Sequence, residues 1–174
     1  GGATAGTLTF MVGGPDADVA AATPFLEVMG RKVVHCGQGG NGQAAKLCNN
    51  MILGISMVAV SEAFVLGEKL GLTNQALFDV ASTASGQCWA LTTNCPVPGP
   101  VPTSPANNDY TPGFAAALMR KDLGLAADAV RATGVPARMG LLAAELYEEY
   151  AREHGGSDFS GIVQDIRERS GETA

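Results

Sequence analysis

One lysine and one asparagine, four residues apart, carry the strongest chemical signal in this sequence. Lys46 and Asn50 follow the glycine-rich stretch 37–42 and begin a long apolar segment. On a helix, side chains four residues apart lie on the same face, so the amine and the amide would border one site. The helix dipole and apolar neighbours both disfavour a positive charge there, which suits a lysine that exchanges protons. The alternative is an ordinary lysine near a helix start.

The glycines before this lysine also match a phosphate-binding pattern. Gly37, Gly39 and Gly42 have the spacing of the dinucleotide-binding fingerprint, and segment 31–36 could supply the strand before it. That fingerprint needs a second strand ending in an acidic residue about 20 residues on, whereas helix is expected throughout that distance. The sequence therefore favours a flexible turn into the helix over a phosphate site.

A second lysine lies on the apolar stripe of a helix expected over about 113–133. Lys121 occupies the middle of that stripe, and Asp122 lies at its margin. The apolar members of the stripe are Phe114, Leu118 and Leu125. Such a lysine can extend its stem toward water or pair with a carboxylate. It can also bind an anionic ligand in a shared pocket, and the residues alone leave both possibilities open.

Composition limits the class of protein. The chain has 174 residues, the length of one domain, and its 46% hydrophobic and 16% charged residues indicate a globular protein. A net charge of -6 and a pI near 4.8 argue against sequence-independent binding of nucleic acid, which needs a basic patch.

The four cysteines predict neither a disulfide framework nor a metal site. No two of the cysteines have the Cys-x-x-Cys spacing, and they form no metal-binding pattern with the two histidines. They are Cys36, Cys48, Cys88 and Cys95. A reduced cytosolic or organellar setting is therefore expected.

Hydrophobic periodicity predicts a mainly α chain after a short β-α-β piece. Strands are expected over 7–12 and 31–36, around a helix over about 15–29. The later helices are expected over about 41–70, 73–82, 113–133 and 136–154, with a last one starting at Ser157 or Ser160. The β-α-β piece, 1–38, is too small for a domain and resembles the end of a larger sheet.

The helix expected over 41–70 is apolar on all sides, so it should be buried on every side. In so short a chain, complete burial is reached more easily with a second subunit. Asn49, Asn50 and Ser56 interrupt the apolar run, which favours a buried helix over a membrane span.

Segment 95–112 holds six of the nine prolines and should be irregular. It is either a surface connection or a loop that borders a site. Trp89, the single tryptophan, is expected to pack rather than to serve as a stacking platform.

The stretch Gly-x-Gly-Gln-Ala-Ala-Lys46-x-Cys-Asn-Asn50 resembles the catalytic-lysine motif of the β-hydroxyacid dehydrogenases. The likeness extends along the whole chain, through segments 6–14, 85–89, 94–99, 110–114 and 118–126. The cysteine-tryptophan and proline segments point to the 3-hydroxyisobutyrate dehydrogenase branch. The resemblance implies a remnant of the NAD-binding domain over 1–38. It also implies an all-helical catalytic, substrate-binding and dimerisation domain over 39–174, built round a long buried helix.

The resemblance also assigns roles to single residues. It implies that Lys46 is the general acid/base acting on the substrate hydroxyl and that Asn50 binds and orients the substrate. Gly1 and Gly2 would be the remnant of a Ser-Gly-Gly substrate-binding motif whose serine precedes this sequence. The residues implied to contact the cofactor are Lys121, Phe114 and Asp122.

The implied reaction is NAD-dependent oxidation of (S)-3-hydroxyisobutyrate to methylmalonate semialdehyde, in valine breakdown. NAD would be bound mainly by an N-terminal domain, so the sequence, which starts at Gly1 without methionine or targeting segment, is expected to be an inactive fragment. The expected partners are the hydroxy acid and a second copy of the chain, in a homodimer or higher homo-oligomer, without nucleic acid or membrane. The setting would be cytoplasmic in a bacterium or the mitochondrial matrix in a eukaryote.

The residues leave two alternatives open. One is a tartronate-semialdehyde or glyoxylate-type reductase of the same family, which would use the same lysine on another small acid. The other is a noncatalytic helical dimerisation module.

Overall fold

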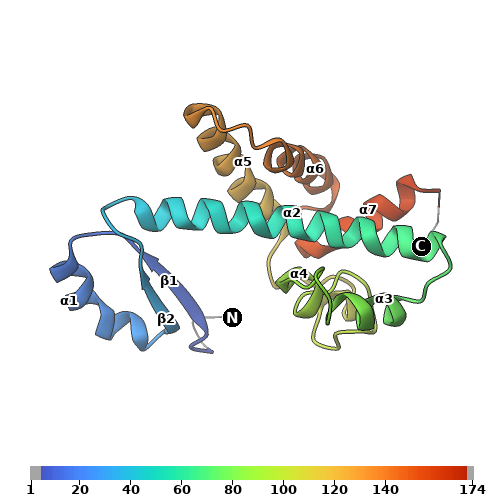
Figure 1. The fold of residues 1–174 in the computed structure, drawn as a ribbon, viewed down its shortest axis with the longest axis horizontal. Coiled ribbons are helices and arrows are strands. Elements are labelled where there is room, and N and C mark those ends of the chain that lie inside the picture. The colour runs from blue at the N-terminus through green and yellow to red at the C-terminus, as the bar shows by residue number, and fades with distance from the viewer. Residues whose placement is uncertain (1–4, 172–174) are drawn as a thin grey trace. The chain divides into compact units, whose positions relative to one another are not determined.

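A computed structural model describes residues 5–171, so the predicted substrate-binding Gly1 and Gly2 lie outside the described residues. The first part is a β-α-β unit. Strands β1 (Leu8–Val12) and β2 (Gly30–His35) pair in parallel, and helix α1 (Asp16–Glu27) connects them (Figure 1). Parallel strands need such a crossover, because a tight turn would reverse the chain direction. The predicted β-α-β piece is confirmed.

Glycines make the turn from β2 into the next helix. Gly37 and Gly40 adopt left-handed φ angles of 100° and 92°, which residues with a side chain rarely adopt. A Cβ on Gly42 would collide with the backbone carbonyl of Met11. The sheet of the described residues has two strands, β1 and β2, so the second strand that the dinucleotide fingerprint needs after the helix is not there.

Helices dominate the rest of the described chain, which confirms the mainly α prediction. They are α2 (Asn41–Lys69), α3 (Asn74–Ala81), α4 (Trp89–Thr92), α5 (Ala116–Thr133), α6 (Arg138–His154) and α7 (Ile162–Arg169), with 3-10 turns η1 (Pro105–Asn107) and η2 (Phe159–Gly161). The chain divides into two compact units within α2, the first ending at Asn49 and the second beginning at Asn50.

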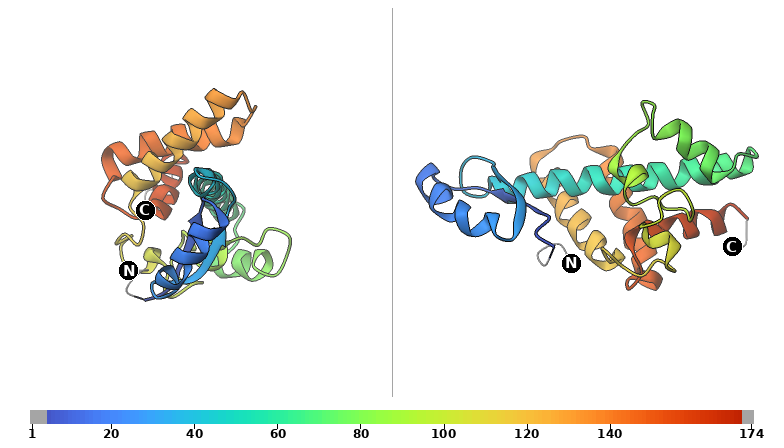
Figure 2. Two further views of the ribbon diagram at one scale, coloured as in Figure 1. Left: turned by 90° about the vertical axis from the view of Figure 1, so that its left-hand side faces the viewer. Right: turned by 90° about the horizontal axis from the view of Figure 1, so that it is seen from below.

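In the second unit, other helices pack on two sides of α2. Helices α5 and α6 lie on one side, and α3 and α4 on the opposite side (Figures 1 and 2). The approach of α5 is close, because a Cβ on Gly54 would lie 2.9 Å from the methyl groups of Leu123. A Cβ on Gly140 of α6 would likewise lie 2.6 Å from the sulfur of Met51.

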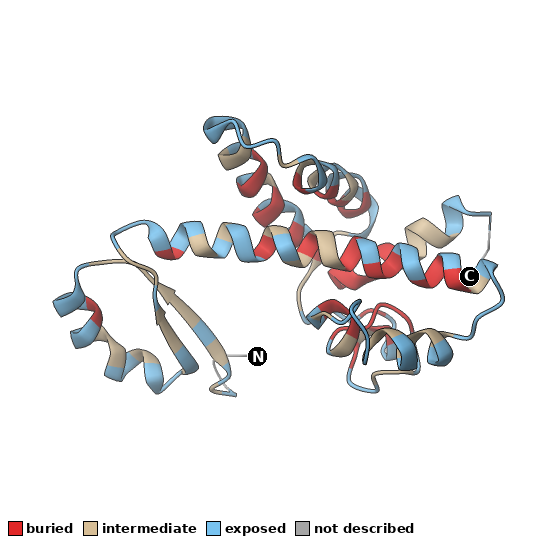
Figure 3. Cartoon of the chain, in the orientation of Figure 1, coloured by how far each residue is buried: buried red, intermediate tan, exposed pale blue. Residues whose placement is uncertain are grey.

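The core of this unit gathers where these helices meet (Figure 3). Its largest fully buried side chains include Tyr147, Phe64, Phe159, Met57, Met119 and Leu123. The proline-rich segment contributes as well: Cys95 and Val97 are fully buried, and the Tyr110 hydroxyl donates to the Pro96 carbonyl at 2.8 Å. The start of that segment is therefore a core element rather than a surface connection.

Helix α2 is not buried on every side within one chain. Ile52 and Leu66 are 64% and 60% exposed, although Met57 and Phe64 on the opposite face are buried. Among the described residues, α2 is the helix long and apolar enough to cross a membrane by length and composition alone. Its buried face belongs to the core, and core helices of globular proteins meet the same criterion.

Local details both confirm and correct the sequence prediction. The helix predicted over about 73–82 is confirmed as α3, and Thr73 caps it by accepting the Ala76 N–H at 3.2 Å. The last helical segment starts at neither predicted serine, because the Asp158 carboxylate caps η2, which leads into α7. Trp89, predicted to pack, is 51% exposed at the start of the unpredicted helix α4.

Candidate functional site

A buried polar contact in the helical unit joins two of the predicted site residues. The Asn50 side-chain amide of α2 donates to Oδ2 of Asp122 on α5 at 2.6 Å. Both residues are buried, with exposures of 8% and 7%. Because burying a carboxylate is costly unless it accepts hydrogen bonds, this contact helps α5 to keep its position on α2.

The helical pattern of α5 explains why Asp122 points inward. Asp122 shares the buried face of the helix with Met119, Leu123 and Ala126, which lie three residues before it and one and four after it. The close approach at Gly54, one turn after Asn50, brings the two helices near enough for the contact. The pairing was not predicted from the sequence, because the expected apolar stripe through Leu118, Lys121 and Leu125 left Asp122 at its margin, whereas the buried face is the one that carries Asp122.

The contact also fixes which way the Asn50 amide faces. The amide nitrogen is the donor to Asp122, so it is the edge of the amide that faces the carboxylate. The carbonyl oxygen of Asn50 then lies on the other edge of the amide group. A side chain held in this way can present a hydrogen-bonding edge to a ligand without first losing rotamer freedom.

Lys121 lies on the outer face of α5. It is exposed, as are its stripe neighbours Leu118 and Leu125, at 50% and 48%. Phe114, just before α5, is half-buried and meets Phe159 edge-on, with ring centroids 5.6 Å apart. The exposed face of helix α5 therefore carries the Lys121 amine between two apolar side chains, and its buried face carries the Asp122 carboxylate.

Lys46 lies in the first part of α2 and is exposed. The apolar surroundings expected from its sequence neighbours do not bury it in this chain. It precedes Asn50 by four residues on the same unbroken helix, so the helix itself directs both side chains to one side.

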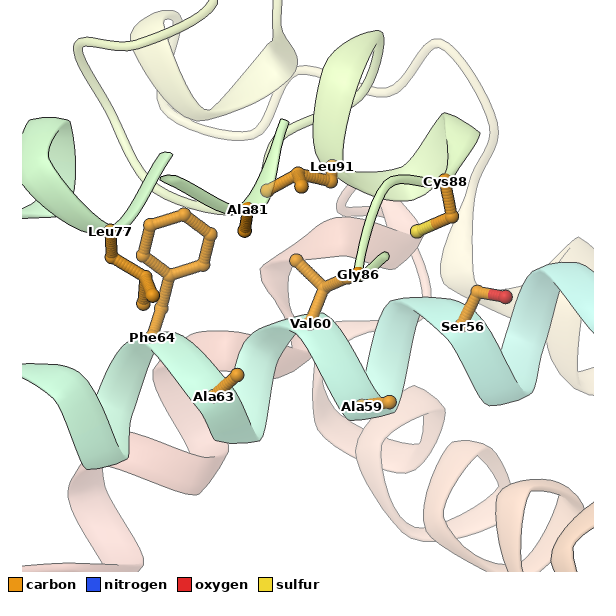
Figure 4. A pocket seen from close by; sticks show the side chains of 10 residues that line it. All are labelled: Ser56, Ala59, Val60, Ala63, Phe64, Leu77, Ala81, Gly86, Cys88 and Leu91. Atoms are coloured by element: carbon orange, nitrogen blue, oxygen red, sulfur yellow. The ribbon is translucent and has the colours of Figure 1, made fainter. Parts of the chain in front are cut away.

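An apolar groove of about 380 Å³ lies elsewhere in the helical unit (Figure 4). Its lining side chains come from α2, α3 and the segment around α4, and they include Val60, Phe64, Leu77 and Leu91. Such a lining does not suit a small charged hydroxy acid. Among residues 5–171, no group of three histidine, cysteine or acidic side chains could hold a metal ion.

Models of known families match most of the chain. A family model described as "NAD-binding of NADP-dependent 3-hydroxyisobutyrate dehydrogenase" matches residues 40–166. The chain belongs to this family. A second model, "NAD binding domain of 6-phosphogluconate dehydrogenase", matches residues 1–37.

Individual members of the 3-hydroxyisobutyrate dehydrogenase family are similar along almost all of the chain. A "Probable 3-hydroxyisobutyrate dehydrogenase" of Mycobacterium tuberculosis (strain ATCC 25618 / H37Rv) is 58% identical over 169 residues, which are 97% of this chain and 58% of that protein. The human "3-hydroxyisobutyrate dehydrogenase, mitochondrial" is 46% identical, over 97% of this chain and 50% of its own length. The chain thus spans between 50% and 58% of these relatives' own lengths.

A solved structure shows the same fold. The structure of "Mycobacterium tuberculosis 3-Hydroxyisobutyrate dehydrogenase (MtHIBADH) + L-serine" superposes with a TM-score of 0.93 at 58% identity. The match covers 95% of this chain and 57% of that chain.

Proposed function

We propose that this chain supplies the catalytic lysine and the substrate-binding helices of an NAD-dependent dehydrogenase that oxidises (S)-3-hydroxyisobutyrate to methylmalonate semialdehyde. The family and its named relatives support this assignment. The observation that carries it is the buried hydrogen bond between Asn50 and Asp122, one helical turn after Lys46. It supplies a fixed amide beside a lysine on one helix face.

Each polar side chain has a role in this proposal. The Lys46 amine accepts the proton of the substrate hydroxyl during oxidation and returns it to the aldehyde oxygen in the reverse direction. Asn50 binds the substrate through its amide. Asp122 orients that amide. The resemblance also implies that Asp122 contacts the cofactor.

Residues of α5 and of the segment just before it also fit a nicotinamide cofactor. The Lys121 ammonium offers N–H donors that suit the carboxamide oxygen of a nicotinamide, and Leu118 and Phe114 offer apolar surface that suits its ring. NAD, when bound, would supply the hydride acceptor. We propose that the nucleotide-binding sheet, of which residues 1–38 form the last part, binds most of the cofactor.

The test is the effect of Lys46→Ala in the whole protein to which this sequence belongs. NADH formation from (S)-3-hydroxyisobutyrate should fall by roughly 10²- to 10⁴-fold in kcat, the usual contribution of a general acid/base. Lys69→Ala, which removes a lysine from the other end of the same helix, is the matched control and should leave kcat unchanged. A Lys46→Ala protein with normal turnover would show that this amine is not catalytic.

The same assay separates the alternatives. Faster reduction of tartronate semialdehyde or glyoxylate would favour a reductase of the same family, and parallel reactions with NADP establish the cofactor preference. No turnover on any of these substrates would favour a noncatalytic module. The 174 residues by themselves should show no oxidation of the hydroxy acid. Their described sheet has two strands, and in this proposal most of the NAD is bound by the larger nucleotide-binding sheet to which those strands belong.

We also propose a homodimer or higher homo-oligomer. The exposed face of α2 carries apolar side chains, among them Ile52 and Leu66 at 64% and 60% exposure, and a second subunit would bury them. Elution of the whole protein as a monomer at micromolar concentration would contradict this.

A further inference from the structure

A buried carboxylate outside the predicted site organises the approach to α5. Asp158 lies between α6 and α7 and is only 1% exposed. Its Oδ2 accepts the backbone N–H groups of Gly113 and Phe114, both at 3.0 Å. Its Oδ1 accepts the N–H and hydroxyl of Ser160, at 3.0 and 2.7 Å, and the side-chain amide of Asn94, at 3.2 Å.

All five of these donors are neutral groups. The carboxylate is therefore stabilised by N–H and O–H dipoles that converge on it from three separate segments of the chain. Because two of the donors belong to Gly113 and Phe114, just before α5, the charge of Asp158 acts directly on the backbone that leads into that helix.

Phe114 is held on several sides by the same segment. The Phe159 N–H donates to the Phe114 carbonyl at 2.9 Å, and the two rings meet edge-on. The Asp158 N–H donates to the Tyr110 carbonyl at 2.8 Å, which ties down the chain just before Phe114. The position of Phe114 therefore depends on Asp158 and Phe159 together.

We propose that Asp158 is a positioning residue for the cofactor. Through Phe114 and the start of α5, it fixes the wall that receives the nicotinamide. This inference rests on the proposed function, in which Phe114 and Lys121 form that wall. Asp158 itself does not touch the reacting atoms.

The substitution that tests this is Asp158→Asn, which keeps the shape of the side chain. In either orientation of the new amide, its NH₂ group faces N–H groups that donated hydrogen bonds to the carboxylate. Two donors then face each other without an acceptor between them. Either the Gly113–Phe114 backbone or the Ser160 segment must then move. We expect the dissociation constant for NADH to rise by roughly tenfold, a modest loss of binding free energy, while kcat changes less than about threefold.

The experiment uses the whole protein and measures NADH binding by fluorescence titration, which does not depend on turnover. Hydrogen exchange at the Gly113 and Phe114 amides is followed in parallel and should accelerate in Asp158→Asn. The control is Glu68→Gln, which removes the partly buried carboxylate paired with Arg167 at 2.8 Å and should leave NADH binding unchanged. Ser160→Ala removes one donor from the same carboxylate and should shift both readouts less, in the same direction, even if Asp158→Asn does not fold.

A double-mutant cycle shows whether Asp158 acts through Phe114. In a Phe114→Leu background, Asp158→Asn should add little further loss of NADH affinity, because the group being positioned has gone. Fully additive losses, or a normal NADH affinity in both Asp158→Asn and Ser160→Ala, would overturn the inference. If the unaltered whole protein does not bind NADH, both the proposed function and this inference are overturned.

Discussion

The pair formed by Asn50 and Asp122 shows how a single buried hydrogen bond can hold two helices together and orient an amide. The carboxylate stays buried because it accepts the amide proton, and the amide is oriented because only its nitrogen can face the carboxylate. In the sequence the two residues lie 72 positions apart, so neither neighbourhood reveals the other.

We predict that Asp122→Ala destabilises the whole protein by about 2 kcal/mol, because it leaves the Asn50 amide buried without this acceptor. It should also raise KM for the hydroxy acid, since the amide is no longer held. Urea unfolding and steady-state kinetics measure the two effects. The matched control on the same helix is Asp128→Ala, whose exposed ion pair with Arg131 should contribute less than about 1 kcal/mol. Equal effects of the two variants would contradict the assigned role of Asp122.

Helices α2 and α5 meet closely because α2 has no side chain at the crossing. A Cβ on Gly54 would press on the fully packed methyl groups of Leu123. A Cβ on Gly124, the next residue of α5, would instead meet no other atom of the described residues within 4 Å beyond its chain neighbours and its own helix backbone. Two glycines near one crossing thus have opposite consequences for the packing.

Gly54→Val should therefore destabilise the protein by about 1–3 kcal/mol, the usual cost of overpacking a core. It should also weaken substrate binding, because α5 moves away from α2 and carries Asp122 with it. Gly124→Val inserts the same side chain into open space, and the better helix propensity of valine should leave stability unchanged or slightly higher. Thermal unfolding of both variants is the measurement. A neutral Gly54→Val would show that the crossing has spare room.

At the scale of the whole molecule, the helical core buries several weakly acidic groups. Burial raises the pKa of Cys95, Tyr110 and Tyr147 above their ordinary values of 9.0 for the thiol and 10.0 for the phenols. For Tyr147 the rise is large. The folded protein therefore keeps these groups protonated at pH values where the unfolded chain loses the protons.

Stability should accordingly be lost as the pH rises above about 9, where the unfolded thiol starts to ionise, and more steeply above about 10. Tyr147→Phe removes one of these protons along with the hydroxyl that donates to the Phe159 carbonyl at 3.1 Å. This variant should be less stable at neutral pH by about 1 kcal/mol but should lose stability less steeply above pH 10. Urea unfolding at several pH values tests this, and identical slopes would contradict it.

Much of the helical architecture could be predicted from the sequence, because local rules decide it. The apolar period of the long helix, the Thr73 cap and the strand before Gly37 all act between near neighbours. Lys46 and Asn50 could be identified as a pair for the same reason, since one helix sets their spacing.

What only the tertiary structure decided is which distant residues meet. Asp122 turned out to face Asn50 because α5 crosses α2 at Gly54, and the amphipathic pattern alone left it at the margin of a stripe. Asp158 had no signal at all, since its carboxylate gathers donors from three segments far apart in the chain. Periodicity and capping are fixed within a few residues, whereas burial of a charge is settled by every segment that packs around it.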